Sequence, residues 1–251
     1  MRFFRTDLTV SQKPDHTPVT EADLATERII VAGLRDKFDY PILAEETVDD
    51  PARFKSEYVW IVDPLDGTRN FSQGDPNFGV LIGLIQNSRP VLGVVFLPAL
   101  DKLYFAEAGK GAYLSVNGAL PVRIRVSAKN DPAEMRVFIS KQLVGKMELL
   151  HSFGFQKIER FGGFSPKAVQ IADGEADIYL NIDPKGSEWD TCAPEVIVTE
   201  AGGRMTDMYG AELPYNQENP ARLKGDIVSN GSEVHAKVVR ELIPQLRSEH
   251  A

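Results

Sequence analysis

The stretch that decides the fold is WIVDPLDGTRNF, residues 60–71. Its first three residues are aromatic or β-branched, which predicts a buried strand, and the proline and glycine that follow predict a turn. Two aspartates, Asp63 and Asp66, stand where this apolar strand ends. A buried carboxylate without a partner is costly, so the pattern indicates that a positively charged group meets both side chains.

The composition is that of an ordinary globular protein. The chain has 251 residues, of which 43% are hydrophobic and 25% charged, and this length can bury one large core or two joined halves. The formal net charge of -8 argues against a nucleic-acid-binding surface, which needs a basic patch. A small anionic ligand stays compatible with this charge, because a bound cation inverts the local field.

Cysteine and histidine usage argues against two kinds of site. Cys192 is the only cysteine, so no intramolecular disulfide forms, which fits a reducing compartment. With one cysteine and four scattered histidines, a structural zinc site is not expected. No apolar run reaches the roughly 20 residues of a membrane span, and the start, MRFFRTDLTV, lacks the hydrophobic region of a signal peptide. We therefore expect a cytoplasmic protein without a membrane partner.

The order of the predicted elements indicates a layered α+β architecture. Helical spacing of apolar residues covers 20–38, a short strand covers 41–47, and a series of strands with tight turns covers 78–118. This series predicts an antiparallel meander. In the second half we expect strands within 136–141, 156–163, 177–182 and 226–230, and helices over 146–155, 165–176, 189–201 and 232–247. Strands and helices that come in runs, rather than in strict alternation, are typical of α+β layers.

Five acidic residues share one property, which is that each ends an apolar element or opens a helix. They are Asp23, Glu45, Asp63, Asp66 and Asp190. Asp63 and Asp66 flank a short turn, so both side chains can point into one space. Two unit charges about 4 Å apart repel by about 4 kcal/mol at an effective dielectric constant near 20, and a divalent cation removes that repulsion. Hard oxygen ligands select Mg²⁺ or Mn²⁺ over zinc.

Each of these acids also has a plainer interpretation. Taken alone, the D-x-x-D-G pattern of 63–67 is more often a turn with aspartate hydrogen bonds than a metal site, and Glu45-Glu46 is more often solvated charge. The segment also lacks the alternating acids of an EF-hand loop. However, the acids occur together with Gly67-Thr68, which opens a helix whose amide groups can bind an anion. Carboxylates, a metal and anion-binding amides together indicate metal-assisted hydrolysis of a phosphoester.

Four motifs carry a resemblance to a known family. They are VTEAD at 19–23, AEE at 44–46, DPLDGTRNF at 63–71 and WDTCAPEVIVTEAGG at 189–203. In this order and spacing they resemble the inositol monophosphatase superfamily of Mg²⁺-dependent, lithium-sensitive phosphatases, and the similarity runs from about Phe3 to the end. The resemblance implies a layered α-β-α-β-α sandwich in a single domain, 1–251, with a metal-binding half, 1–130, and a substrate-side half, 131–251. The family usually has a further helix before the FRTDLTV stretch, and we expect that helix to be absent here.

The resemblance also implies a site for two or three Mg²⁺ ions. Its motifs place the ligands of the main metal sites at Glu45, Asp63, Asp66 and the backbone carbonyl of Leu65. Asp190 resembles the carboxylate that joins Asp66 at the second metal, and it is also a substrate-binding position.

The same motifs imply which residues act on water and phosphate. Asp23 and Thr68 resemble the pair that orients and deprotonates the attacking water, and Gly67 with Thr68 matches the turn that holds the phosphate. Glu46 matches an acid behind the metal ligands or a ligand of a third metal. No covalent phosphoenzyme is needed in this scheme, so Cys192 is interpreted as a small buried helix residue.

Two features resemble the nucleotidase branch of the superfamily. WDTCAPEVI looks like that branch's version of its motif, and Lys167 stands where nucleotidases place a lysine that can bind a second phosphate. As an alternative, Lys167 is a solvated charge in the first turn of a helix. Ser165, just before Pro166, is interpreted as a helix cap and as a substrate-contact position.

We therefore predict a 3'(2'),5'-bisphosphate nucleotidase that acts on adenosine 3',5'-bisphosphate. The alternatives within the class are an inositol 1-phosphate phosphatase and a sugar-phosphate phosphatase with a substrate such as fructose bisphosphate or histidinol phosphate. Outside the class, a non-catalytic relative that binds a phosphorylated ligand stays open. The predicted partner is a small phosphorylated metabolite rather than a nucleic acid, and a homodimer is compatible with the resemblance.

Overall fold

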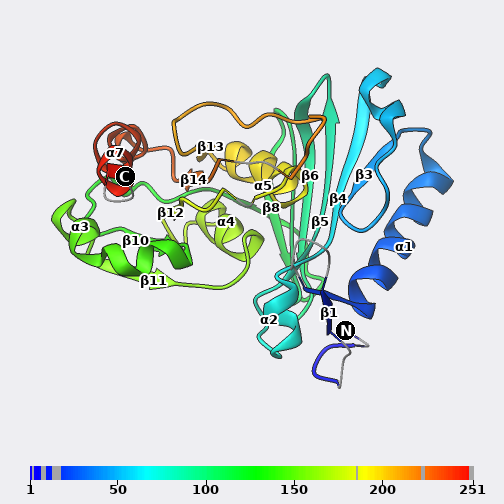
Figure 1. The fold of residues 1–251 in the computed structure, drawn as a ribbon, viewed down its shortest axis with the longest axis horizontal. Coiled ribbons are helices and arrows are strands. Elements are labelled where there is room, and N and C mark those ends of the chain that lie inside the picture. The colour runs from blue at the N-terminus through cyan, green and yellow to red at the C-terminus, as the bar shows by residue number, and fades with distance from the viewer. Residues whose placement is uncertain (2, 7–9, 13–17, 185, 222–223, 249–251) are drawn as a thin grey trace.

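The computed structural model describes residues 1, 3–6, 10–12, 18–184, 186–221 and 224–248, and it has five layers of alternating helices and sheets (Figure 1). Helix α1 (Glu21–Lys37) covers one face of a seven-stranded sheet, and α4 (Ser165–Ala172) and α5 (Glu188–Glu200) cover the other. A five-stranded sheet follows, and α3 (Met147–Ser152), α6 (Glu233–Lys237) and α7 (Ile243–Ser248) form the outer layer. The predicted α-β-α-β-α sandwich is confirmed.

The seven-stranded sheet contains the predicted antiparallel meander as β5 to β8, extended by the antiparallel strands β4 and β9 and by the parallel strand β3. Its order is β3-β4-β5-β6-β7-β8-β9. The strands are β3 (Ile42–Ala44), β4 (Tyr58–Asp66), β5 (Gly79–Gln86), β6 (Arg89–Leu97), β7 (Lys102–Glu107), β8 (Gly111–Val116) and β9 (Val122–Ile124). Asn87 and Ser88 join β5 to β6 with φ of +48° and +60°, the left-handed pair that a tight hairpin requires.

The five-stranded sheet is mixed. Its order is β11-β10-β12-β14-β13, with β10 parallel to both of its neighbours and β14 antiparallel to both of its own. The strands are β10 (Arg136–Ile139), β11 (Lys157–Arg160), β12 (Ile178–Asn181), β13 (Arg204–Asp207) and β14 (Asp226–Ser229). Strand β13 is not predicted from the sequence, because its four residues carry no clear apolar alternation.

The remaining elements are short. Strands β1 (Val10–Gln12) and β2 (Pro18–Thr20) pair antiparallel before α1, and α2 (Thr68–Ser72) follows β4. Single 3₁₀ turns cover Pro51–Lys55 and Lys141–Lys146. The helix expected over 232–247 is present as α6 and α7 joined by a wider π-helical turn, Val238–Leu242.

The packing of α5 on the first sheet leaves no room for side chains at two glycines. A Cβ atom added to Gly93 on β6 would lie 2.2 Å from the carbonyl oxygen of Ala193, and one added to Gly83 on β5 would lie 2.5 Å from Cys192 Sγ. The helix therefore rests directly on the backbone of the sheet at Cys192 and Ala193, in the turn that follows Asp190. Cys192 is fully buried in this contact, as the sequence predicts for a structural residue.

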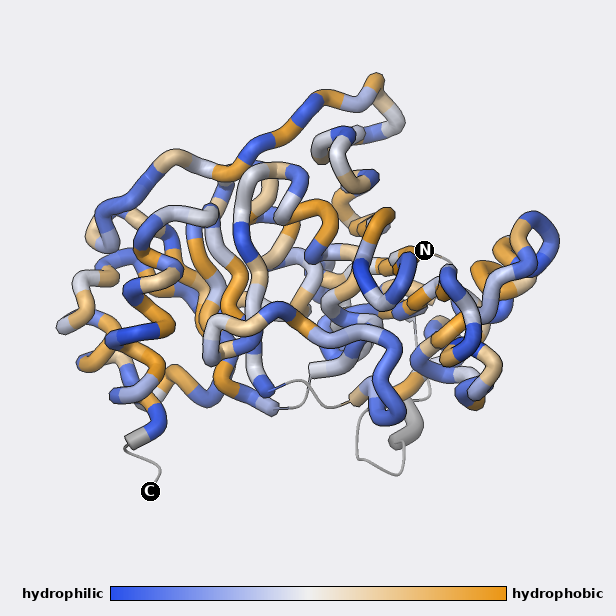
Figure 2. The backbone as a smooth tube through the Cα atoms, turned by 90° about the horizontal axis from the view of Figure 1, so that it is seen from above, coloured by the Kyte–Doolittle hydropathy of each residue, from blue (hydrophilic) through white to orange (hydrophobic). Residues whose placement is uncertain are grey.

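Hydrophobic and hydrophilic stretches alternate along the backbone (Figure 2). The main core lies between the two sheets around α4 and α5, and a second core lies under α3, α6 and α7. Across the part of the chain that the structure describes, no helix combines the length and the apolar character needed to cross a bilayer.

Candidate active site

The end of β4 brings two aspartates to one place because the strand is irregular there. Asp63 pairs with Leu81 and Asp66 pairs with Gly79, and the register shifts between these two pairs. The sequence places a turn at Pro64, whereas the structure continues the strand to Asp66 through this irregularity. A proline has no N–H to donate, so it fits a position where the ladder is interrupted.

Three carboxylates meet at this strand end. Asp63, Asp66 and Asp190 each offer one oxygen, and these oxygens lie within 4.8 Å of one another. Burial raises the pKa of Asp63 and of Asp190 well above the ordinary value, and the negative charges of the neighbouring acids raise both further. The carboxylate of Glu45 contributes to both shifts, so its charge belongs to the same cluster.

Backbone contacts hold these acids in position. The amide of Glu45 donates to the carbonyl of Val62 (3.2 Å), which places Glu45 beside the end of β4. Asp63 Oδ1 accepts from the amide of Leu65 (2.8 Å). Asp190 lies in the first turn of α5, where its Oδ2 accepts from the amide of Ser187 (2.7 Å) as part of a capping box.

Asp66 is bound by the start of α4. Its Oδ1 accepts from the amide of Phe164 (3.1 Å), and its Oδ2 accepts from both the amide and the hydroxyl of Ser165 (2.6 Å each). The predicted helix cap at Ser165 is wrong, because α4 begins at this residue and the hydroxyl binds Asp66 instead of the helix backbone. This contact ties the strand end of the first sheet to the helix that lies over the second.

Asp23 and Thr68 are hydrogen-bonded to each other. Thr68 Oγ1 lies 2.9 Å from Asp23 Oδ1 and 3.2 Å from the carbonyl oxygen of Leu65. The other oxygen of Asp23 accepts from the amide (2.8 Å) and the hydroxyl (2.5 Å) of Thr20, so the carboxylate is fixed. Gly67, with φ of +86°, makes the turn that starts α2 at Thr68.

The backbone of Glu46 is held by an acid that sequence reasoning missed. Its amide donates to Glu27 Oε2 (2.8 Å), and the hydroxyl of Thr47 donates to the other oxygen of Glu27. Glu27 is buried on α1, four residues after Asp23 and therefore on the same helix face. That spacing is the signal in the sequence that identifies it.

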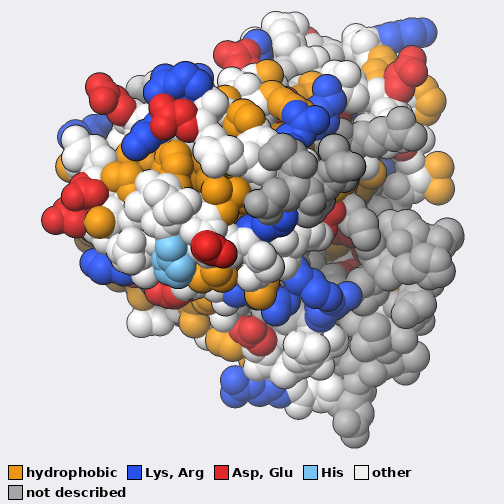
Figure 3. All heavy atoms as spheres, turned by 60° about the vertical axis from the view of Figure 1, so that its left-hand side comes forward, with side chains coloured by type: hydrophobic (Ala, Val, Ile, Leu, Met, Phe, Trp, Pro, Cys, Tyr) orange, Lys and Arg blue, Asp and Glu red, His pale blue; other side chains and the backbone are white. Residues whose placement is uncertain are grey.

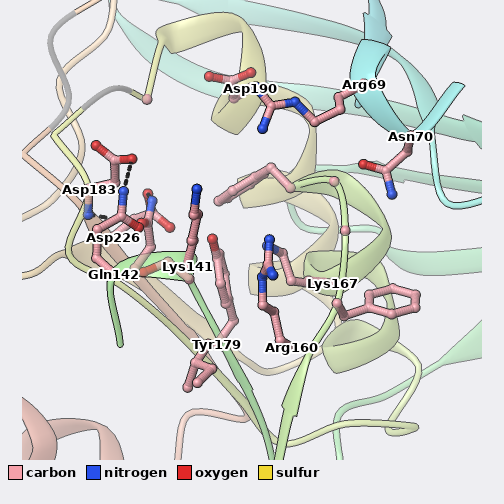
Figure 4. Close-up of a pocket in the computed structure, with 18 of the residues that line it drawn as sticks. Arg69, Asn70, Lys141, Gln142, Arg160, Lys167, Tyr179, Asp183, Asp190 and Asp226 are labelled. Carbon is pink, nitrogen blue, oxygen red and sulfur yellow. Dashed lines mark hydrogen bonds between the residues drawn. The ribbon is translucent and has the colours of Figure 1, made fainter. Parts of the chain in front are cut away.

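A cavity of about 380 Å³ opens next to Asp190 and is lined by residues from both halves of the chain (Figure 4). Four basic side chains line it: Arg69, Lys141, Arg160 and Lys167. Its other polar lining residues include Tyr179, Asn181, Asp183 and Asp226. Sequence reasoning found only Lys167 and Asp190 among these residues: Arg69 lies in the 63–71 motif but received no role, and the others come from separate elements and lie outside the motifs. On the face shown in Figure 3, basic and acidic side chains are mixed, and several basic groups gather near its centre.

Lys167 is buried rather than solvated. Its side chain is 6% exposed, and its Nζ lies 3.9 Å from the ring centroid of Tyr179. Burial lowers the pKa of Lys167 to about 8, while the charges of Asp66 and Asp226 oppose that shift. The alternative interpretation of Lys167 as a solvated charge is therefore wrong.

Comparison with known proteins identifies the family of the chain. The model of the inositol monophosphatase family matches residues 1–246. The chain belongs to the inositol monophosphatase family. Members of this family hydrolyse phosphomonoesters with Mg²⁺, so the protein is a phosphoric monoester hydrolase and the non-catalytic alternative is set aside.

Relatives within the family act on different substrates, as their names state. The histidinol-phosphatase of Mycobacterium tuberculosis is 34% identical over 96% of this chain and 91% of its own length. The 3'(2'),5'-bisphosphate nucleotidase CysQ of Salmonella typhimurium is 35% identical over 82% of each chain. Among solved structures, an IMPase of Thermotoga maritima has a TM-score of 0.84 and 32% identity, and covers 100% of this chain and 92% of its own.

Proposed function

We propose that this phosphatase removes the 3'-phosphate of adenosine 3',5'-bisphosphate. The observation that carries the proposal is the group of four basic side chains in the cavity next to the acid cluster. The scissile phosphate would bind at the acid cluster together with the metal ions. The basic side chains in the adjoining cavity then favour a substrate with a second anionic group. The identity to several CysQ nucleotidases, 30–35% among those compared, supports the same choice.

The donor set at the end of β4 fits Mg²⁺. It consists of oxygen ligands whose mutual repulsion is relieved by a divalent cation. Glu45, Asp63, Asp66, Asp190 and the carbonyl of Leu65 would hold two or three ions, with Glu46 behind them or at a third. When bound, Mg²⁺ lowers the pKa of a water molecule and neutralises charge on the phosphate.

The residues around the metal ligands then orient the attacking water and the scissile phosphate. The Thr68 hydroxyl donates to Asp23 and can accept a hydrogen bond from the attacking water, which fixes the direction of attack. Asp23 serves as the general base through Thr68: as the Thr68 hydroxyl takes a proton from the water, it passes its own proton to Asp23 Oδ1. The other oxygen of Asp23 is held by Thr20, which fixes the orientation of the carboxylate. The amides of Gly67 and Thr68 hold the scissile phosphate in our scheme. Ser165 acts through Asp66, and Asp190 would both hold a metal ion and contact the substrate, because it belongs to the acid cluster and lines the cavity.

A second candidate substrate is histidinol phosphate. The relative from Mycobacterium tuberculosis supports it, and so does the presence of Asp183 and Asp226 in the same cavity, since these acids suit a leaving group that carries a positive charge. The two candidates differ in the sign of the charge beyond the scissile phosphate. That difference makes them separable in one assay.

The test is a substrate panel with and without Mg²⁺. We expect the highest kcat/KM for adenosine 3',5'-bisphosphate, and no turnover in the presence of a chelator. A preference for inositol 1-phosphate or histidinol phosphate would reject the nucleotidase assignment. The number of metal ions, the cytoplasmic location, a homodimer and the division of the domain near residue 130 stay predictions.

A further inference from the structure

Two polar side chains that line the cavity have no role in the proposed mechanism. Asp226 is 1% exposed and Ser140 is 7% exposed. Within the part of the chain that the structure describes, Asp226 Oδ2 and Ser140 Oγ are buried atoms without a hydrogen-bond partner. Buried polar atoms in proteins are nearly always paired, so two such atoms beside one cavity indicate a ligand that supplies the partners.

The second sheet sets these two residues side by side with Asn181. Asn181 on β12 pairs with Asp226 on β14. The amide of Ser140, directly after β10, donates to the carbonyl of Leu180 (3.0 Å) and so extends the ladder to the same row. Each of the three lies two positions from a residue of the main core, and side chains at that spacing share one face of a strand. These core residues are Phe138, Tyr179 and Val228. The polar row therefore stands on the inner face of the sheet, at the end that borders the cavity.

Asn181 determines which oxygen of Asp226 stays available. The Asn181 side chain donates from Nδ2 to Asp226 Oδ1 (3.0 Å), and its Oδ1 accepts from the amide of Asp183 (3.0 Å). Both ends of the Asn181 amide are thus used, and Asp226 Oδ2 is left as an acceptor. Burial raises the pKa of Asp226 to about 7, against the hydrogen bond from Asn181 and the charge of Lys167. A carboxylate that is buried with one oxygen unpaired is stabilised when a ligand donates to that oxygen.

The place of the row in the cavity indicates which part of a substrate it meets. Asp226 lies across the cavity from Arg69 and Asn70, which directly follow the turn proposed to hold the scissile phosphate (Figure 4). With that phosphate at Gly67 and Thr68, the cavity leads away from it towards Asp226. A carboxylate repels a second phosphate at this end, whereas it attracts a hydrogen-bond donor on the leaving group.

We propose that the row of Ser140, Asn181 and Asp226 recognises a nitrogen donor of the leaving group, with Asp226 Oδ2 and Ser140 Oγ as the acceptors. In adenosine 3',5'-bisphosphate this donor is the exocyclic amino group of adenine. In histidinol phosphate the ammonium group supplies the same chemistry. For adenine the inference rests on the proposed function, and it names the residues that select the base.

The variant Asp226→Asn tests the acceptor, because the new side chain has the same shape. It keeps an oxygen for Asn181 Nδ2 and presents an NH₂ group in place of Oδ2. Inosine 3',5'-bisphosphate carries a carbonyl oxygen where adenine carries its amino group. We expect the wild type to prefer the adenosine substrate over the inosine substrate by about 10- to 100-fold in kcat/KM, because it alone donates to the charged acceptor. Asp226→Asn should lose or reverse this preference.

The matched control is Asp207→Asn. Asp207 on β13 pairs with Asp226, but its Oδ1 accepts from the amides of Tyr209 (2.9 Å) and Ala211 (2.8 Å), and it is not among the described residues that line the cavity. This variant should keep the preference of the wild type. Ser140→Ala removes the second acceptor and should reduce the preference about 2- to 10-fold. Thermal unfolding shows whether each variant is folded, and Ser140→Ala decides if Asp226→Asn is not.

Turnover by the wild type tests the proposed function separately from this subsite. Poor turnover of both bisphosphates rejects the nucleotidase assignment. In that case, a loss of about 10-fold or more for histidinol phosphate in Asp226→Asn still supports the subsite, provided that inositol 1-phosphate, which has no nitrogen, changes less than about twofold.

Three results overturn the subsite. The first is a wild type that turns over the bisphosphates well but without preference, or with a preference that Asp226→Asn shares. The second is unchanged turnover of histidinol phosphate by Asp226→Asn when the bisphosphates are poor substrates. The third is a wild type that hydrolyses inositol 1-phosphate and none of the substrates with a nitrogen donor, which rejects the nucleotidase assignment as well.

Discussion

Replacing Asp63 by Asn should stabilise the metal-free protein while removing its response to Mg²⁺. The carboxylate oxygens of Asp63, Asp66 and Asp190 lie within 4.8 Å of one another. At this separation two full charges repel by about 3 kcal/mol at an effective dielectric constant near 20. Proton uptake relieves part of that repulsion, so we expect Asp63→Asn to raise the free energy of unfolding without metal by about 1–3 kcal/mol.

The pH dependence has a defined sign. The pKa of Asp63 is raised in the folded protein, so the folded state binds more protons than the unfolded state between the two pKa values. The stability of the metal-free wild type therefore falls as the pH rises from the ordinary carboxyl range through the raised value. Asp63→Asn should show a smaller fall over the same range.

The assay is denaturant unfolding with Mg²⁺ or with a chelator. At a Mg²⁺ concentration of about 100 times Kd, the wild type should gain about 2.7 kcal/mol, and Asp63→Asn should gain little. Asp183→Asn is the control, because this acid lines the cavity outside the cluster and should leave both values unchanged. A variant that is less stable without metal and keeps the full Mg²⁺ response would refute the assignment of Asp63 as a repelled metal ligand.

Three further predictions follow from the same structure. Thr68→Val should lower kcat about 100-fold or more with little change in KM, whereas Thr68→Ser should keep most of the activity, because the mechanism uses the hydroxyl that is bound to Asp23. Equal activity of the two variants in steady-state assays would contradict this role. Gly93→Ala should lower the free energy of unfolding by about 1–3 kcal/mol, because the added Cβ would lie 2.2 Å from the Ala193 carbonyl, and an unchanged melting temperature would show that α5 can move. Burial lowers the pKa of His235 to about 4, so the folded state loses stability as the pH falls from about 6.5 towards 4; a His235→Gln variant with the same acid unfolding curve would rule out this source.

The acidic residues of the site can be predicted from the sequence because each lies in a local motif. Asp63 and Asp66 are separated by two residues, and Asp23 and Asp190 each lie in the first turn of a helix. Each acid can therefore be identified from the few residues around it in the sequence. Their meeting point follows from the family resemblance, and the structure brings Asp63, Asp66 and Asp190 together. The roles of these residues stay predictions until they are tested.

The cavity was largely beyond sequence reasoning for a physical reason. Arg69, Lys141, Arg160 and Tyr179 come from four elements, and only the register of β10, β11 and β12 brings the last three to one edge. Ser165 shows the other limit. A serine before a proline predicts a cap, in which its oxygen accepts a hydrogen bond from a helix amide, but here the Ser165 hydroxyl donates a hydrogen bond to the buried carboxylate of Asp66.

The fold likewise has elements that local sequence signals predict and elements that depend on contacts with distant residues. The meander of β5 to β8 was predicted because its hairpin turns and alternating residues are local signals. Strand β13 was missed because it is held only by its pairing with β14, a contact that no nearby residue indicates. The continuation of β4 through Pro64 was missed because the irregular register depends on its partner strand.

The most direct test of the central claim is the Mg²⁺ dependence of phosphate release from adenosine 3',5'-bisphosphate by the wild type and by Asp66→Asn. We predict that the wild type releases the 3'-phosphate only with Mg²⁺, and that Asp66→Asn loses this Mg²⁺-dependent turnover while remaining folded. Unchanged, Mg²⁺-dependent release by Asp66→Asn would contradict the account of a metal centre built at the end of β4.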